Sequence, residues 1–403
     1  MVSTLTTEAE RPLYLGFVGL TWGIGTILGP IIGGAFADSS ATWRWSFYIN
    51  LCIGGTAAPV YLFLLPGYNP RPGIGILTRA KELDFVGGIL SAGAMTTLVM
   101  AISFGGGVYR WDSGQIIGLF ISTGVLWVLF ILQQAFALLT TSSRRLFPVD
   151  LVRSWEMDIL FSQMAIAQTL VMLPIYFIPI FFQFTKGDNA IDSGVRLLPF
   201  VLVLVFAVML NGAMMAKLGY YMPWYLLGAI FALIGSCLLH TIDLYMSRGR
   251  VYGFSVLAAL GTGLYSQAGF AVAQVKAPPQ QLSQATAFIG VGQVGGIKLA
   301  LALSNSILLN RATDKISYIL PGAARGVIQQ AISGVRASFF TTLSPSDRTR
   351  VLGAVVESIA DVFIMMIAAA AVSTVLAIFM KREKLFVKLP PSNDAEATQE
   401  PSP

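Results

Sequence analysis

The stretch GFVGLTWGIGTILGPIIGGAFADSSATWRWSFYIN, residues Gly16 to Asn50, is apolar, rich in glycine and interrupted by a proline. Runs of this kind are long enough to cross the roughly 30 Å hydrocarbon core of a bilayer. The whole chain of 403 residues is 55% hydrophobic and only 11% charged, with a mean hydropathy of +0.72. This composition predicts an integral membrane protein, with the lipid bilayer as its surroundings.

Ten apolar runs of about twenty residues each predict ten transmembrane helices. The runs are continuous rather than alternating, which favours helices over a β-barrel. We therefore predict an all-α, polytopic membrane protein. Its spans lie near 14–36, 46–66, 84–106, 114–139, 158–184, 193–217, 220–240, 250–274, 284–309 and 356–380.

Clusters of cysteine or histidine are absent from the sequence. Its two cysteines, Cys52 and Cys237, lie in apolar runs, and His240 is the single histidine. We therefore predict no metal site, no cofactor and no disulfide framework. His240 stands at a span end, where an interfacial role is favoured over a proton relay.

Lysine and arginine are unevenly divided among the connections. If the first residues are cytoplasmic, the inner side holds Arg71, Arg79, Lys81, Arg144, Arg145, Arg153, Lys217, Lys276, Lys381, Arg382, Lys384 and Lys388. The short outer connections hold only Arg44, Arg110, Lys186, Arg248 and Arg250. This excess predicts that both termini are cytoplasmic. It also accounts for the net charge of +6 without any binding of nucleic acid.

Glycines recur at helical spacing in the opening stretch. Gly25, Gly29 and Gly33 lie four residues apart, and Gly34 widens the same helix face. A stripe without side chains lets two helices pack closely in lipid, where no hydrophobic force drives them together. Pro30 removes one helical hydrogen bond and favours a bend. A packing stripe is the simplest interpretation of the spacing.

The wider pattern resembles a known family. Gly16, Gly25, Gly29, Pro30, Gly33 and Gly34 together resemble the antiporter motif of the major facilitator superfamily. WRWSFYIN (43–50) resembles the junction into the next helix in fungal fourteen-helix drug:proton antiporters. SFGGGVYRWDSGQIIGLF (103–120) resembles the inserted helix pair of that branch, and SGVRLLP (193–199) the start of its tenth helix. The resemblance implies a secondary active transporter that exports small, largely apolar compounds, such as toxins, drugs or other secondary metabolites, and that is coupled to protons when complete. It further implies the plasma membrane, with the vacuolar membrane as the alternative.

The order of helices departs from that family, in which the glycine-rich helix is the fifth. The resemblance implies the last ten of fourteen helices: residues 1–66 end the N-terminal bundle, and 67–157 hold inner linkers and the inserted pair. Residues 158–380 then form a six-helix C-terminal bundle with an outer loop at 310–355, before a disordered cytoplasmic tail at 381–403. Two explanations stay open: a fragment of a full exporter, or a short protein that serves as a non-transporting scaffold or regulatory remnant. A membrane enzyme is disfavoured because His240 alone offers no catalytic pair.

GVGQVGG, Gly290 to Gly296, contains the spacing GxGxxG. A dinucleotide site needs a preceding strand and a βαβ unit, and this stretch lies inside an apolar span. Close helix packing is therefore the favoured interpretation.

Polar residues within the spans are candidates for a substrate cavity, because each must find a partner or face water. Lys298 is the clearest of them, since it lies roughly 16 Å from the nearer end of its predicted span at 1.5 Å per residue. Gln284, Lys298 and Asn305 are separated by multiples of seven and share one helix face. We predict that Lys298 lines a cavity and binds an anionic or carbonyl-bearing substrate; the alternative is a buried structural partner. The other candidates are Gln293, Gln267, Gln163, Gln168 and Asn211.

Carboxylates that could couple transport to protons are scarce in the spans. Asp84, Asp158, Glu357 and Asp361 all lie at span ends. The sequence of the spans therefore does not identify the residue that would couple transport to protons.

Overall fold

The computed structural model describes residues 11–64, 73, 75, 78–79, 82–141, 144–278, 281–334 and 339–385. The predictions for residues 1–10, for Arg71 and Lys81, and for the tail beyond Leu385 fall outside these ranges. Nine helical segments of the described chain are long and apolar enough to cross a membrane. The helix α2 (Arg11–Asp38) covers the remaining predicted span. The prediction of an all-α membrane protein with about ten spans is confirmed.

The helices fall into three groups along the chain. The first group is α3 (Trp45–Pro59), the π-helical turn η1 (Val60–Leu64), α5 (Phe85–Phe104), α6 (Gly114–Phe136) and α7 (Val149–Val152). The second group is α8 (Trp155–Lys186), α9 (Ala190–Val195), α10 (Leu198–Leu218), α11 (Met222–His240), α12 (Arg248–Gly263) and α13 (Ala268–Lys276). The last group is α14 (Leu282–Ile319), α15 (Arg325–Ser333), α16 (Phe339–Thr342) and α17 (Pro345–Ile378).

The last two long helices extend beyond their predicted spans. α14 continues to Ile319 and α17 begins at Pro345, so the connection between them covers only 320–344. Polar residues in these extensions are paired: Lys315 Nζ lies 3.0 Å from Asp361 Oδ2 and 3.2 Å from Glu357 Oε1. Hydropathy falls where these ion pairs occur, so both helices continue past their apolar runs into the predicted loop at 310–355.

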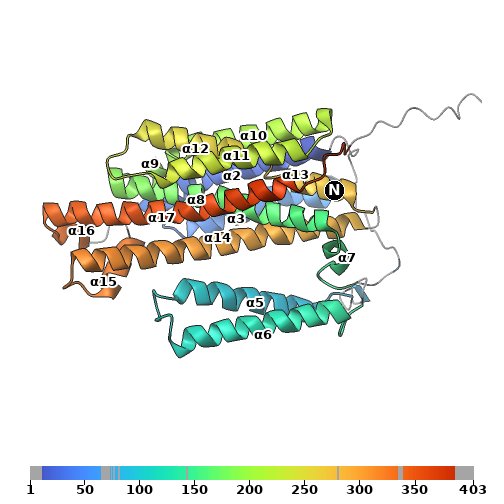
Figure 1. The fold of residues 1–403 in the computed structure, drawn as a ribbon, viewed down its shortest axis with the longest axis horizontal. Helices are drawn as coiled ribbons and strands as arrows, with labels where there is room; N and C mark the ends of the chain where they lie inside the picture. Colours follow the sequence, from blue (N-terminus) through green and yellow to red (C-terminus); the bar gives the residue numbers. More distant parts are fainter. Residues whose placement is uncertain are drawn as a thin grey trace, which may run out of the picture.

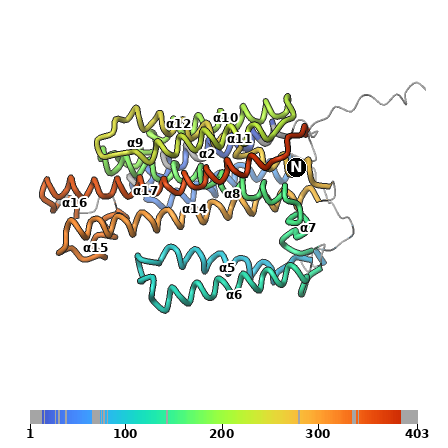
Figure 2. Tube along the Cα trace, in the orientation of Figure 1, coloured from blue at the N-terminus to red at the C-terminus, as the bar shows by residue number. Residues whose placement is uncertain are grey.

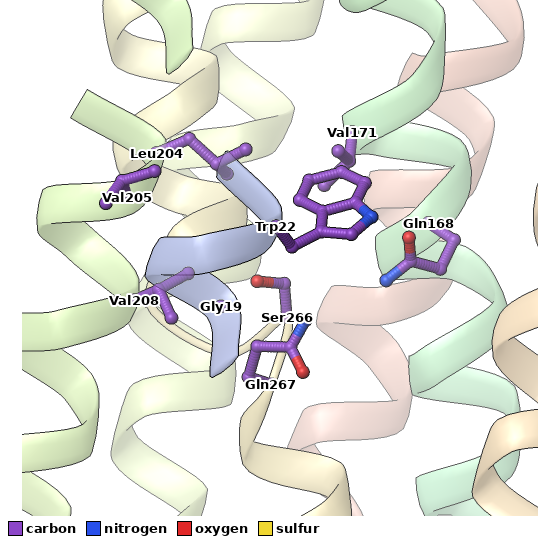
Figure 3. A pocket seen from close by; sticks show the side chains of 9 residues that line it. All are labelled: Gly19, Trp22, Gln168, Val171, Leu204, Val205, Val208, Ser266 and Gln267. Atoms are coloured by element: carbon purple, nitrogen blue, oxygen red, sulfur yellow. The ribbon is translucent and has the colours of Figure 1, made fainter. Parts of the chain in front are cut away.

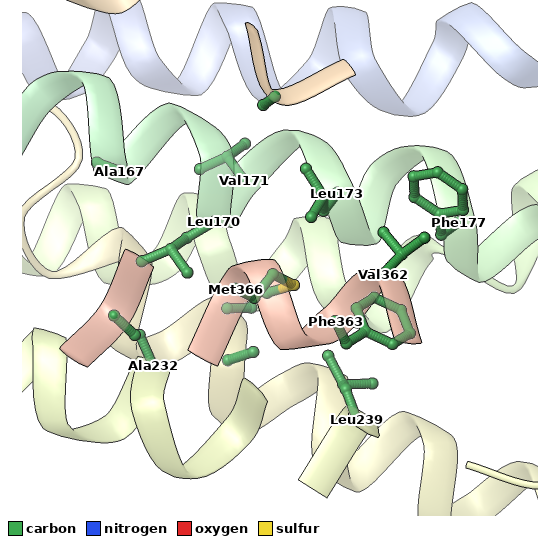
Figure 4. Packing of buried hydrophobic residues seen from close by; sticks show 14 of the residues in the cluster. Ala167, Leu170, Val171, Leu173, Phe177, Ala232, Leu239, Val362, Phe363 and Met366 are labelled. Carbon is green, nitrogen blue, oxygen red and sulfur yellow. The ribbon is translucent and has the colours of Figure 1, made fainter. Parts of the chain in front are cut away.

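The long helices lie side by side in one elongated bundle (Figures 1 and 2). The start of α2 and the end of α17 are at the same end of it, and α15 and α16 are at the other. The centre of the bundle is an apolar core in which α8, α11 and α17 interdigitate (Figure 4). Phe177 of α8 and Phe363 of α17 are completely buried there.

Glycines set the closest helix contacts of this bundle. A Cβ atom built on Gly296 of α14 would lie 2.7 Å from Ala165 Cα of α8. Between α11 and α12, a Cβ built on Gly235 would lie 2.5 Å from the backbone nitrogen of Ala258. Distances this short leave no room for a side chain. Gly296 ends the GVGQVGG stretch, so part of that stretch does pack closely against a neighbouring helix.

The hairpin of α5 and α6 lies beside the bundle (Figure 1). It contacts α14, where Asn310 Nδ2 donates to the carbonyl of Gly105 at 3.3 Å. The turn between the two helices requires glycine at Gly106, whose φ of +74° is rarely adopted by other residues. The glycines of SFGGGVYRWD thus shape this turn.

The opposite end of the hairpin is held by the carboxylate of Asp84. Its oxygens accept hydrogen bonds from the backbone nitrogens of Gly87 (2.8 Å) and Leu146 (3.1 Å). They also accept from the amide nitrogens of Gln133 (3.0 Å) and Gln134 (2.7 Å). Partial burial by itself raises the pKa of Asp84, but these hydrogen bonds outweigh it and hold the pKa below its usual value. Asp84 therefore ties α5, α6 and the linker to α7 as a carboxylate.

We expect Asp84→Asn to destabilise the protein by about 1–3 kcal/mol, because charge-assisted hydrogen bonds are lost. Thermal unfolding in detergent at pH 7 measures this, and Asp112→Asn, in the exposed Arg110–Asp112 ion pair, is the control with little effect. Since the folded pKa of Asp84 is lowered, its contribution is complete above the ordinary value of 3.8 and is lost as the pH falls through the lowered pKa. Equal unfolding temperatures for wild type and Asp84→Asn at pH 7 would contradict this role.

Candidate functional site

One membrane span is broken in the middle. α12 ends at Gly263, and α13 begins five residues later at Ala268. Thr262 Oγ1 donates to the carbonyl of Ala258 at 2.9 Å, a bond within the helix that favours bending. A Cβ built on Gly263 would lie 2.6 Å from the carbonyl oxygen of Leu204, so α12 presses against α10 there. The break leaves the N-terminal end of α13 inside the bundle.

Two adjoining hollows open beside this break. The first is partly open, with an enclosed volume of about 10 Å³, and is lined by Gly19, Trp22, Gln168, Val171, Leu204, Val205, Val208, Ser266 and Gln267 (Figure 3). The second is also partly open, with an enclosed volume of about 10 Å³, and is lined by Gly16, Val208, Asn211, Gly212, Met215, Gln267, Ala268 and Ala271. Val208 and Gln267 belong to both, so the hollows follow one seam between α2, α8, α10 and the broken helix.

Three predicted cavity residues gather at this seam: Gln168, Asn211 and Gln267. Gln168 is 2% exposed and Asn211 is 3% exposed. Gln168 Oε1 and Asn211 Nδ2 have no hydrogen-bond partner among the described residues. Figure 3 shows the Gln168 amide on the same side of the hollow as the Trp22 indole. Buried amides of this kind are available to a ligand or to water.

Gln163 belongs to a different environment. Its Nε2 donates to the carbonyl of Ser373 at 2.8 Å, and its Oε1 accepts from Ser373 Oγ at 2.6 Å. Ser373 Oγ also lies 3.1 Å from Tyr265 Oη, and all three residues are buried. Its amide is thus satisfied within the core, where it joins α8 to α17.

The four predicted residues on α14 lie away from both hollows. Gln284 and Gln293 are half-buried, and Lys298 and Asn305 are exposed. Lys298 makes no ion pair with another described residue. The structure therefore does not bring this stripe together with Gln168, Asn211 and Gln267.

The glycines of the opening stretch have different surroundings. Gly16 lines the second hollow, and a Cβ on Gly34 would lie 3.1 Å from Ala190 Cβ of α9. A Cβ on Gly25 or Gly29 would meet no described atom within 4 Å, and one on Gly33 would meet only Ser46 Oγ, at 3.8 Å. Pro30 lies within α2. Packing of the Gly25–Gly29 face stays a prediction.

Sequence reasoning missed several lining residues. Trp22 and Gly19 stand in the opening stretch but outside the motif, and Ser266 precedes Gln267 at the break. Gly19 approaches α10 closely, since a Cβ there would lie 2.8 Å from Val208 Cγ1. The pair Gly261 and Gly263 around Thr262 was the signal that could have located the break.

The far end of α13 is anchored by charges. Lys276 Nζ pairs with Glu156 Oε2 at 2.6 Å and with Glu383, and Lys381 Nζ pairs with Glu156 Oε1 at 2.6 Å. The hydrogen bond to Glu156 raises the pKa of the exposed Lys381. Leu385 N donates to the carbonyl of Gly219 at 2.9 Å. The segment after α17 thus connects α8, α13 and the α10–α11 turn.

The described lining of the seam is uncharged. Among the described residues, neither hollow is lined by Asp, Glu, Lys, Arg or His, and no cluster of three His, Cys, Asp or Glu could hold a metal ion. The seam offers hydrogen bonds and apolar contact, which suit reversible binding of a small molecule.

Known proteins are similar to this chain over most of its length. The profile of the Major Facilitator Superfamily matches residues 1–300. The MFS-type transporter pgmG of Aspergillus terreus is 51% identical over 96% of this chain and 69% of that protein. The efflux pump alnA of Emericella nidulans is 46% identical over 95% and 70%, and the efflux pump patC of Aspergillus clavatus is 41% identical over 94% and 70%. A solved bacterial homolog of the human lysosomal transporter Spinster aligns with a TM-score of 0.47 at 15% identity, over 94% of this chain and 91% of that one.

These matches cover the opening stretch, the hairpin and the broken helix together. The chain spans about 70% of the length of the efflux pumps alnA and patC. The family is one of transporters rather than enzymes. The chain therefore belongs to the Major Facilitator Superfamily, in its fungal efflux branch.

Proposed function

We propose that this chain is an exporter of small, largely apolar molecules that binds them in the seam between α2, α8, α10 and the broken helix. The observation that carries the site is the break at 264–267, which places Ser266 and Gln267 in the first hollow. Transporters commonly build substrate sites from discontinuous helices near the middle of the membrane. Relatives named as transporters and efflux pumps favour export over a non-transporting scaffold or remnant.

We also propose an orientation and a membrane. The end of α13, the linker before α7 and the segment after α17 lie at one end of the bundle (Figure 1). That end carries Arg144, Arg145, Lys276 and Lys381. An excess of lysine and arginine marks the cytoplasmic side, so we place both termini there. The plasma membrane, with the vacuolar membrane as the alternative, is the membrane across which a toxin would be removed.

Protons are the proposed driving ions. We expect everted vesicles that contain the chain to accumulate the neutral fluorescent compound 6-acetyl-2-naphthol when their interior is acidic. A protonophore should abolish this accumulation, because collapsing the gradient removes the driving force for exchange. Vesicles without the chain are the control. Accumulation that persists with the protonophore would rule out proton coupling, and no accumulation under any gradient would rule out export by this chain.

Lys298 is a separate proposal: it lies away from the seam, and we propose that it lines another part of the transport path and binds an anionic or carbonyl-bearing substrate. A cation this deep in a span costs about 2.5–3.5 kcal/mol facing lipid, which favours a face that meets water or protein. We expect Lys298→Met to keep the yield of folded protein and to reduce vesicle accumulation of 6-acetyl-2-naphthol. Arg311→Met, on the exposed outer part of the same helix, is the control. Loss of folded protein would instead indicate a structural role, and unchanged yield and transport would exclude both roles.

A further inference from the structure

The seam holds two buried polar atoms that have no hydrogen-bond partner among the residues the structure describes. Gln168 Oε1 can accept a hydrogen bond, and Asn211 Nδ2 can donate one. The other end of the Gln168 amide is 3.8 Å from Met164 Sδ, which is a weak acceptor. Leaving such atoms unpaired costs folding free energy, so each calls for a partner that arrives from the hollow.

The end of α13 adds a third polar element. This nine-residue helix begins at Ala268, and Gln267 and Ala268 both line the second hollow. The N–H of Ala268 already donates to the carbonyl of Tyr265 at 3.1 Å, so this helix end contributes through its partial positive charge, which favours an acceptor oxygen nearby. Asn211 lines the same hollow and also presents a donor. Two independent features therefore favour a ligand oxygen at this point.

The remaining lining limits the charge of that ligand. Val171, Leu204, Val205 and Val208 are apolar, and the described lining of both hollows includes no charged side chain. A full carboxylate or ammonium would lose its hydration without an opposite charge to replace it. The partial charge of one helix end offsets only a part of that loss.

We propose that the seam selects a neutral, mostly apolar molecule that carries both a carbonyl and a hydroxyl group. Asn211 Nδ2 donates a hydrogen bond to the carbonyl oxygen, beside the end of α13. Gln168 Oε1 accepts a hydrogen bond from the hydroxyl group. This inference rests on the proposed function, because it takes the seam as the place where the exported molecule binds.

Three matched naphthalenes test the inference by equilibrium binding to the purified 403-residue chain in lipid nanodiscs. They are 6-acetyl-2-naphthol, with both groups; 2-acetylnaphthalene, without the hydroxyl; and the anion of 6-hydroxy-2-naphthoic acid. We expect the first to bind about tenfold more tightly than the second, as one lost hydrogen bond predicts, and the anion to bind at least about tenfold more weakly than the first.

Two substitutions test which of the two amides binds the hydroxyl and which binds the carbonyl of the ligand. Gln168→Leu should remove the preference for 6-acetyl-2-naphthol over 2-acetylnaphthalene, and Asn211→Leu should weaken both by about the same factor. Gln115→Leu, at an exposed position on α6, should change neither affinity. Size-exclusion profiles establish that each variant is folded, and Gln168→Met and Asn211→Asp replace any leucine variant that is not. Methionine removes the acceptor oxygen of Gln168 and aspartate removes the donor of Asn211, so each should reduce the affinity for 6-acetyl-2-naphthol.

Each remaining outcome contradicts the inference. Anion binding as tight as that of the neutral hydroxyketone would overturn the neutral class. Unchanged affinities in both seam variants would mean that the two amides bind only water, and so would a failure of 6-acetyl-2-naphthol to bind at all. The proposed function fails separately: vesicle accumulation with unchanged selectivity in both variants refutes the inference alone, whereas selective binding without any accumulation refutes export alone.

Discussion

Gly296→Leu should prevent the chain from folding, whereas Gly290→Leu on the same helix should not. A Cβ on Gly296 would lie 2.7 Å from Ala165 Cα and closer still to the carbonyl oxygen of Ala165, so backbone atoms of α8 would have to move. A Cβ on Gly290 would meet no described atom within 4 Å. Overpacking with a single methyl or methylene typically costs about 1–3 kcal/mol, and leucine adds four carbons at this contact.

Folded yield in detergent, measured by size-exclusion chromatography of a fluorescent fusion, separates the two variants. Gly296→Ala should give an intermediate result, with a folded protein of lowered unfolding temperature. Equal yields of Gly296→Leu and Gly290→Leu would show that α14 and α8 do not approach as closely as described.

Hydropathy predicted the fold well because each span is an apolar run with polar ends. All ten predicted spans correspond to helices, and the predicted outer loop at 310–355 contains α15, which buries Ile328, Ala331 and Ile332. The ends of α14 and α17 could not be predicted from hydropathy, because the ion pairs of Lys315 with Glu357 and Asp361 allow helix to continue beyond the apolar part.

Polar residues in the spans identified part of the candidate site, yet could not show which residues share it. Gln163 and Gln168 are five residues apart on α8, but Gln163 is paired with Ser373, 210 residues later in the chain, and Gln168 faces the hollow. That distinction depends on a distant contact that spacing along one helix does not reveal. The same holds for Asn211 and Gln267, which only the packing of α10 against the broken helix brings together.

Glycine spacing likewise predicted only part of the helix packing. A regular interval of four directed attention to Gly25 and Gly29, whereas the close contacts of α2 with α10 occur at Gly19 and Gly23, opposite Val208 and Val205. Spacing indicates which residues share a face of a helix. It does not indicate which face meets the neighbouring helix, because that depends on the partner.

Ser266→Cys should make export sensitive to a thiol reagent. Ser266 is 3% exposed and lines the first hollow, so a group attached there would occupy the space in which the substrate is proposed to bind. The exposed native cysteines, Cys52 and Cys237, are first replaced by serine. Ser122→Cys, on the exposed face of α6, is the matched control that reacts without entering the seam.

The most direct test of the seam as the export site is accumulation of 6-acetyl-2-naphthol by everted vesicles after treatment with methyl methanethiosulfonate. In the Ser266→Cys protein, we predict that labelling reduces accumulation to the level of vesicles without the chain. We also predict that 6-acetyl-2-naphthol present during treatment slows the labelling, while Ser122→Cys transports normally when fully labelled. Wild-type accumulation by Ser266→Cys protein that mass spectrometry shows to be completely labelled would contradict the assignment of the seam as the path of the exported molecule.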